Sequence, residues 1–399
     1  MSNSWGQDMQ FIKAVLAMAL IAAATTSHAA DLPAAPEPVD YVRVCDAFGT
    51  GFLYIPGTET CSRIGGRVRA DYRLYGSNKE FGGPGWYTQS QPGYVFRARA
   101  YLYADSRTNT EYGLLRTYSE IWITNDTNAP TNVFIHNAQI QFGGLTAGRT
   151  GSFYDVYFGN TFNTVFKLSG TADPDFAQDL LAYTFDFGGG FTASASVEDA
   201  IYRDPGIWAN GAVRTEAPPK APDIVANVNL KQGWGQFQIM GVLHQVRSRR
   251  GPENAQGWAI GTGAVINLPM LGKGDRLGFQ AGYTQGALRY LARAPVGPTT
   301  ADGVFTGRKL ELVDAWAVGG GFLHNWTPQW STALDASWLS VDAPGRAESF
   351  QNLDLQANLS FRPVAGLLTA LEVEWKHVDV DRGKDPDGLV GMVRVQREF

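Results

Sequence analysis

The sequence has 399 residues and a formal net charge of -5, and 18% of its residues are charged against the ~25% typical of soluble proteins. A net charge this small gives no sign of the basic surface that nucleic-acid-binding proteins carry. Beyond the N-terminal segment no stretch approaches about 18 uncharged apolar residues, which excludes a membrane-spanning helix in the mature chain.

The N-terminal segment predicts an export signal. Residues 11–24 are apolar apart from Lys13, and Ser27-His28-Ala29 offers small residues at the two positions that a signal peptidase reads. We expect cleavage after Ala29, which removes residues 1–29. A membrane anchor is the alternative, but the apolar run is shorter than the roughly 20 residues needed to span a bilayer. An exported chain of this kind is either a soluble secreted protein or an outer-membrane β-barrel.

A Pro- and Ala-rich stretch, 30–42, precedes the two cysteines of the chain, Cys45 and Cys61. Exported thiols meet an oxidising compartment, so a disulfide between them is expected. Closing so short a loop stabilises by ~3 kcal/mol. Two thiols without a nearby histidine form a poor metal site. We therefore expect residues 30–61 to form a disulfide-closed periplasmic extension.

The segment 61–76 shows the pattern that the rest of the chain repeats. Most of its odd positions carry basic or polar side chains, and its even positions are small or apolar. The polar set is Arg63, Arg67, Arg69, Asp71, Arg73 and Tyr75, and the other set includes Ile64, Val68, Ala70 and Leu74. Because a strand sends alternate side chains to opposite faces, this segment has one charged face and one apolar face.

Sixteen segments show this alternation, and short connections between them alternate with long ones. The segments are 61–76, 94–105, 114–124, 133–142, 145–150, 181–187, 191–198, 224–231, 236–246, 258–267, 276–284, 315–326, 330–341, 350–362, 367–378 and 388–399. One tight rim, one rim of long loops and an even strand count are typical of transmembrane barrels.

The chain ends on an aromatic residue, Phe399, inside the last alternating segment. A terminal strand with no tail lets a barrel close, and closure removes the strand edges that lipid does not tolerate. We therefore predict an all-β fold, a 16-stranded antiparallel transmembrane β-barrel over residues 62–399. A soluble sandwich or propeller is the alternative, because alternation by itself does not exclude it.

Residues 151–178 interrupt the alternation with a long, aromatic-rich segment that ends in acidic residues. Long loops of this kind are usually functional or disordered, and the aromatic content argues against disorder. Enzyme signatures such as Gly-x-Ser-x-Gly, His-Glu-x-x-His and the P-loop are absent from the sequence. We expect no catalytic activity and no metal or cofactor.

Three segments resemble the general porins of alphaproteobacteria such as Brucella and the rhizobia. The residues from Cys45 to Cys61, preceded by Tyr41-Val-Arg-Val, resemble the N-terminal signature of that family. Residues 388–399 are similar to its C-terminal strand, and 108–118 to its second hairpin. The middle of the chain matches by pattern alone. Arg397 departs from the pattern on the apolar parity of the last strand, but near a rim its charge can reach water.

The resemblance implies a porin in the outer membrane of a Gram-negative bacterium, surrounded by lipid and lipopolysaccharide and assembled as a homotrimer. It also implies that the third outer loop, here about 151–178, folds into the lumen as a constriction loop. A barrel of this size holds a water-filled channel, whose selectivity depends on its width and on the charges at its narrowest place.

Strand parity places a set of basic side chains on the lumen face. They are Arg67, Arg69, Arg73, Arg97, Arg99, Arg116 and Arg394. From the constriction loop we expect Asp155, Asp173 and Asp175 to face them, so that a transverse field favours small polar solutes. For any single arginine, simple solvation of the lumen is the alternative role.

The function predicted is passive diffusion of ions and small hydrophilic solutes through a general porin. A substrate-specific outer-membrane channel is the first alternative, and a secreted β-rich enzyme or binding protein is the second. Extraction of membranes without and then with detergent separates the last from the others, and conductance in planar bilayers separates the first two.

Overall fold

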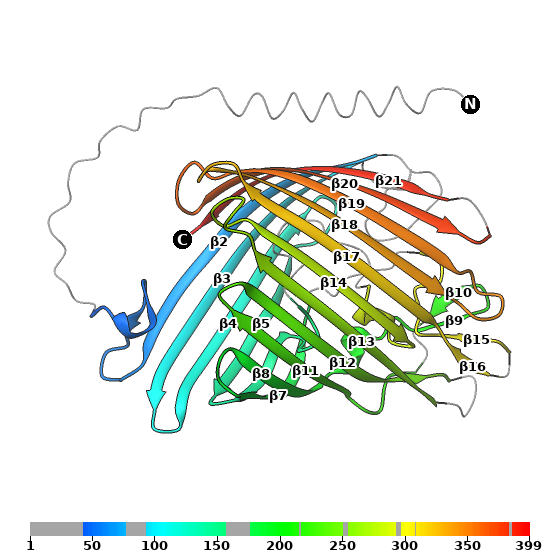
Figure 1. Ribbon diagram of the computed structural model, residues 1–399, viewed down its shortest axis with the longest axis horizontal. Coiled ribbons are helices and arrows are strands. Elements are labelled where there is room, and N and C mark those ends of the chain that lie inside the picture. The colour runs from blue at the N-terminus through cyan, green and yellow to red at the C-terminus, as the bar shows by residue number, and fades with distance from the viewer. Residues whose placement is uncertain are drawn as a thin grey trace.

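The computed structural model describes residues 43–76, 93–156, 176–214, 217–249, 254–292, 297–307, 309–382 and 385–399. The export signal expected at residues 1–29 lies outside these ranges. Within them, sixteen strands form one closed antiparallel barrel, as the sequence predicted (Figure 1). Among the described residues no helix is long and apolar enough to cross a membrane.

Each barrel strand pairs with the next one in the ring. In ring order they are β2 (Cys61–Tyr75), β3 (Tyr94–Thr110), β4 (Gly113–Asp126), β5 (Asn132–Phe142), β6 (Leu145–Gly151), β7 (Ala177–Asp186), β8 (Phe191–Glu198), β11 (Asp223–Gln232), β12 (Gly235–Arg247), β13 (Asn254–Asn267), β14 (Arg276–Gln285), β17 (Asp314–Asn325), β18 (Trp330–Asp342), β19 (Phe350–Phe361), β20 (Leu367–Val380) and β21 (Asp387–Glu398).

The ring closes between the last strand and the first. β21 pairs with β2 from Arg67 opposite Glu398 to Tyr75 opposite Val390. The backbone N–H groups of Gly66 and Phe399 each donate to the other residue's carbonyl oxygen, at 2.9 and 3.0 Å. A Cβ atom on Gly66 would lie 2.7 Å from the Phe399 ring, so a glycine is needed for this contact. The terminal aromatic residue thus completes the barrel.

Side-chain exposure follows the alternation. In β2 the even-numbered Ile64 is 82% exposed, whereas Asp71, on the odd face, is 1% exposed. One irregularity occurs in β5, where the register shifts so that Glu120 pairs with Asn137 but Ile121 pairs with Ile135. His136 is the extra residue of this β-bulge, and it is buried on the lumen side.

The N-terminal extension lies at the end of the barrel where the turns are short. It holds η1 (Asp46–Phe48) and β1 (Leu53–Tyr54), and β1 pairs with the start of β2. Cys45 and Cys61 form the expected disulfide, and Phe52 packs beside them with 1% of its surface exposed. In barrels of this class the short-turn end faces the periplasm.

Two connections that the sequence predicts to be polar or plain loops, 199–222 and about 290–313, contain secondary structure. The first holds η2 (Ala200–Arg203), β9 (Ile207–Ala209) and β10 (Ala212–Arg214). The second holds η3 (Leu288–Tyr290), β15 (Gly303–Phe305) and β16 (Leu310–Leu312). Their strands form a separate sheet in the order β10-β9-β15-β16, at the end opposite the disulfide (Figure 1). We call these six elements the mouth insert.

The mouth insert packs against the inner face of the barrel. Its apolar side chains Leu288, Leu291 and Val304 share one buried cluster with inward-facing residues of β17 to β20. The barrel contributes Ala315, Ala317, Leu339, Val341, Phe350 and Val378 to this cluster. A lumen face would carry polar side chains at these positions if water covered it. Their apolar character is the sequence signal of the insert, and it was missed.

The disulfide closes a loop outside the barrel ring, which yields a prediction. Replacing Cys45 and Cys61 together by serine should destabilise the extension by about 3 kcal/mol, because the loop then regains its freedom in the unfolded state. Limited proteolysis should cut the variant within 43–60 faster than the wild type. Its single-channel conductance should be unchanged, and an altered conductance would contradict this placement.

Candidate functional site in the barrel lumen

Nine arginines cover one part of the inner barrel surface, on four neighbouring strands. They are Arg63, Arg67, Arg69 and Arg73 on β2, Arg97, Arg99 and Arg107 on β3, Arg116 on β4, and Arg394 on β21. We call this set the arginine wall. It includes all seven arginines named from the sequence, and closure of the barrel brings Arg394 beside the others. Arg63 and Arg107 were not among those seven, although strand parity identifies them.

Asp71 joins the arginines at the seam where the barrel closes. Arg394 donates to both of its carboxylate oxygens, from Nε at 2.7 Å and from Nη2 at 3.0 Å. Arg69 and Arg73 approach the same carboxylate at 3.5 and 3.6 Å. Asp71 and Arg394 are both buried, so this bidentate pair is shielded from water. It holds β21 to β2 through side chains as well as through the backbone.

Two further carboxylates compensate other members of the wall. Asp105 accepts from both Arg107 and Arg116, with the shortest contacts at 2.7 and 2.9 Å. Asp126 forms a bidentate pair with Arg97 at 2.6 and 2.7 Å. These pairs fix the orientation of the guanidinium groups, but they also neutralise much of the charge that the sequence suggested.

Arg63, Arg67 and Arg99 are different, since among the described residues no carboxylate lies within ion-pair distance of any of them. The guanidinium carbon of Arg67 lies 3.8 Å from the centroid of the Tyr101 ring, and that of Arg99 lies 4.7 Å from the Trp122 ring. Cation–π contacts of this kind hold a guanidinium without cancelling its charge. The guanidinium carbon of Arg63 lies 5.2 Å from the Phe52 ring centroid, near the short-turn end of the barrel. Within the described residues, these three arginines therefore carry the positive charge of the wall that no carboxylate compensates.

The ring beneath Arg99 is itself held in place. Trp122 donates from Nε1 to Glu120 at 2.7 Å and stacks on His136 with the ring centroids 3.9 Å apart. The β-bulge in β5 brings His136 to this position. The aromatic side chains of the lumen thus support the arginine, an arrangement that sequence parity did not reveal.

The start of the expected constriction loop lies inside the lumen. Tyr154 and Val156 are buried against Met240 and Ala259, on the inner faces of β12 and β13. The Asn227 side chain of β11 donates to the Phe153 carbonyl oxygen at 2.6 Å. The described part of the loop therefore follows the barrel wall over β11 to β13. Residues 157–175, with Asp173 and Asp175, lie outside the described residues.

Asp155 does not face the arginine wall, contrary to the expectation from the sequence. It is 6% exposed and accepts a hydrogen bond from Arg203 at 2.6 Å. A buried carboxylate needs such a partner, because desolvating an unpaired charge costs several kcal/mol (about 3–5 when one partner is removed). Asp155 thus anchors the loop and does not line the passage.

Sequence reasoning also missed an acidic patch on the inner faces of β18 to β20. Asp335, Asp354, Glu372 and Glu374 lie there, all 4% exposed or less. Lys376 binds Glu374 at 2.8 Å and Asp354 at 3.6 Å. Strand parity could have found this patch, since each carboxylate lies on a lumen-facing position. Its strand β20 pairs directly with β21, which carries Arg394 of the arginine wall.

Comparison with known proteins gives one consistent result. The model of a family described as the porin subfamily matches residues 30–391. Porin Omp2b of Brucella canis is 29% identical over 407 residues, covering 96% of this chain and 97% of that protein. The same porin of Brucella suis is 28% identical over 406 residues, again covering 96% and 97%.

Solved structures share the fold at low sequence identity. The outer membrane channel DcaP of Acinetobacter baumannii has a TM-score of 0.70 at 15% identity, covering 87% of this chain and 99% of that one. Salmonella typhi OmpF, solved in complex with daunomycin, has a TM-score of 0.56 at 10% identity, covering 86% and 98%.

The uncompensated charge of Arg67 and Arg99 yields a second prediction. Replacing both by glutamine should lower the chloride-over-potassium permeability ratio by roughly twofold or more, because the unpaired cations attract anions to the lumen. Zero-current potentials in a KCl gradient measure this ratio.

The matched control removes a compensated pair, Arg97→Gln with Asp126→Asn, and leaves the net charge of the lumen unchanged. Its permeability ratio should stay at the wild-type value. Equal effects in the two double variants would show that Arg67 and Arg99 have no special role.

Proposed function

Because the chain belongs to the porin subfamily, it is an outer-membrane channel for passive diffusion of ions and small hydrophilic solutes, and we propose that the arginine wall selects among them. The family indicates a channel and not an enzyme. The observation that carries the proposal is that three arginines on the lumen face, Arg63, Arg67 and Arg99, have no carboxylate partner among the described residues.

The distribution of exposed side chains supports a passage along this wall. The side chains of Arg97 and Arg107 are 18% and 25% exposed. On the far strands, Gln280 and Thr284 of β14 are 2% and 0% exposed. The mouth insert and the start of the constriction loop fill the lumen beside β11 to β20, so water reaches the arginine side. Anions moving through that space meet unpaired guanidinium groups, which favour them.

We propose that the acidic patch of β18 to β20 supplies the second sign of a transverse field. It carries four carboxylates and one lysine among the described residues, close to the arginine wall around the ring. Within the described residues the field thus runs between the arginine wall and the acidic patch, and Asp155 takes no part in it. Such a field favours polar solutes, whose dipoles align in it, over apolar ones.

We also propose that the channel assembles as a homotrimer in contact with lipid and lipopolysaccharide. OmpT of Vibrio cholerae, solved in a trimer form, has a TM-score of 0.55 to this chain. The outer barrel surface carries exposed apolar side chains such as Val68, Leu102 and Ile140.

In this proposal residues 1–29 are a signal peptide that is removed on export, and residues 30–61 form a periplasmic extension.

The test is recording from the purified protein in planar bilayers. Ohmic single-channel steps should appear, and sugars below the size limit should pass in liposome-swelling assays without blocking the current. Native mass spectrometry should give three copies of the chain. Absence of any channel would overturn the proposal, and saturable block by one class of solute would favour a substrate-specific channel.

A further inference from the structure

On the basis of the proposed channel function, we propose that Arg203 sets the size limit of the passage. It acts as a positioning residue that ties the start of the constriction loop to the mouth insert, and it touches no solute itself. Arg203 lies at the end of η2, in the connection after β8, and is 2% exposed.

The Arg203 guanidinium binds groups from three separate parts of the chain. Nη2 donates to Asp155 of the constriction loop at 2.6 Å. Nε donates to the Gln178 side chain of β7, and Nη1 to the Arg289 carbonyl oxygen of η3, both at 3.1 Å. A planar guanidinium offers donors in several fixed directions, which a lysine does not. One side chain thus joins the constriction loop, the barrel wall and both halves of the mouth insert.

Glu198 at the end of β8 provides a second attachment for the constriction loop. Its carboxylate accepts from the Ser152 hydroxyl at 2.6 Å and from the Phe153 backbone N–H at 3.0 Å. The Ser196 hydroxyl donates to it as well, at 2.6 Å. Glu198 therefore holds the constriction loop at Ser152 and Phe153, directly after β6, and Arg203 holds it at Asp155.

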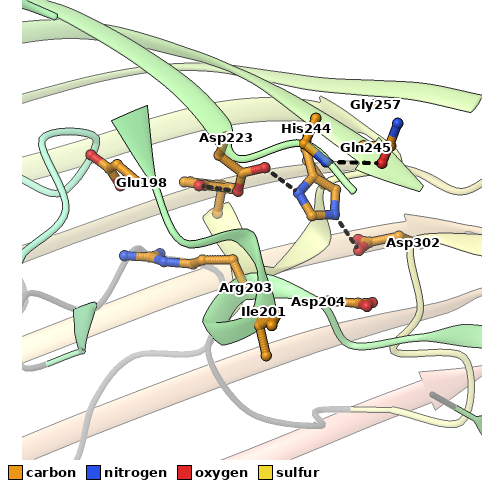
Figure 2. A network of polar contacts seen from close by, with 12 residues as sticks. Glu198, Ile201, Arg203, Asp204, Asp223, His244, Gln245, Gly257 and Asp302 are labelled. Atoms are coloured by element: carbon orange, nitrogen blue, oxygen red, sulfur yellow. Dashed lines mark hydrogen bonds and ion pairs between the residues drawn. The ribbon is translucent and has the colours of Figure 1, made fainter. Parts of the chain in front are cut away.

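The mouth insert is attached to the wall by a separate group of charges, shown in Figure 2. His244 of β12 lies between two carboxylates, with Nδ1 2.8 Å from Asp223 and Nε2 3.3 Å from Asp302. The Tyr290 hydroxyl donates to the second Asp223 oxygen at 2.6 Å. Tyr290 also packs its ring against Arg203, whose guanidinium carbon lies 4.8 Å from the ring centroid. Tyr290 therefore connects the group around His244 with the group around Arg203.

Arg203 keeps its charge over the physiological pH range. Burial opposes this charge, but the Asp155 carboxylate outweighs the effect of burial and raises the pKa of Arg203 above its usual value.

Loss of Arg203 removes the cation that lies 2.6 Å from the buried Asp155 carboxylate. A buried carboxylate that loses such a partner is destabilised, so the loop moves until the carboxylate reaches water. The segment Ser152–Val156 then leaves the inner faces of β11 to β13, and the passage changes its width.

The experiment compares Arg203→Gln with Arg346→Gln, which removes the same charge from an exposed position between β18 and β19. For Arg203→Gln we expect single-channel conductance to change by roughly one and a half fold or more, with added current noise, and the sugar size limit to shift. Arg346→Gln should match the wild type. Asp155→Asn should reproduce the Arg203→Gln effect, and the double variant should add nothing further, because both changes break one link.

Heat-modifiable migration in gels establishes that each variant has folded. If Arg203→Gln does not fold, the milder Asp155→Asn carries the test. A folded variant with wild-type conductance, noise and size limit overturns the inference. A wild type that forms no channel overturns the proposed function instead, so the two failures are distinguishable.

Discussion

Closure of the sheet is the constraint on which the rest of this structure depends. In lipid every backbone donor and acceptor needs a partner within the protein, and a sheet meets that requirement only as a closed ring. Here the ring closes through the pairing of β2 with β21, the reciprocal hydrogen bonds of Gly66 and Phe399, and the buried pair of Asp71 and Arg394. Closure also brings the first and last strands together, and with them the arginines that dominate the lumen.

A second principle governs the interior, namely that buried charges must be paired. Six of the nine arginines of the wall pair with Asp71, Asp105 or Asp126, and among the described residues this leaves Arg63, Arg67 and Arg99 without a carboxylate partner. The same requirement explains how the constriction loop and the mouth insert are held in place. Arg203 pairs with Asp155, and His244 lies between Asp223 and Asp302, all away from the arginine wall. We place the proposed passage by this division, because among the described residues the mouth insert and the start of the constriction loop fill the side of β11 to β20 and not the side of the arginine wall.

The strand pattern predicted the fold well, because inward and outward positions alternate with a period that sequence shows directly. The strand count and the lumen parity of Arg67 to Arg394 came from that pattern, whereas the disulfide was predicted from the export signal and the oxidising compartment that it implies. The mouth insert did not, because its strands of three residues are too short for a periodic signal. Asp155 was assigned to the passage from its loop alone, and nothing in the sequence shows that Arg203, 48 residues away, is its partner. Residue pairs set by tertiary contact lie beyond single-sequence reasoning.

We propose that arginines without a carboxylate partner among the described residues make the lumen attractive to anions. The most direct measurement is the zero-current potential of the wild-type channel across a KCl gradient, at low ionic strength where screening is weak. We expect a potential with the sign of chloride selectivity, which shrinks as the salt concentration rises. A potential with the sign of potassium selectivity, or none at any salt concentration, would contradict it.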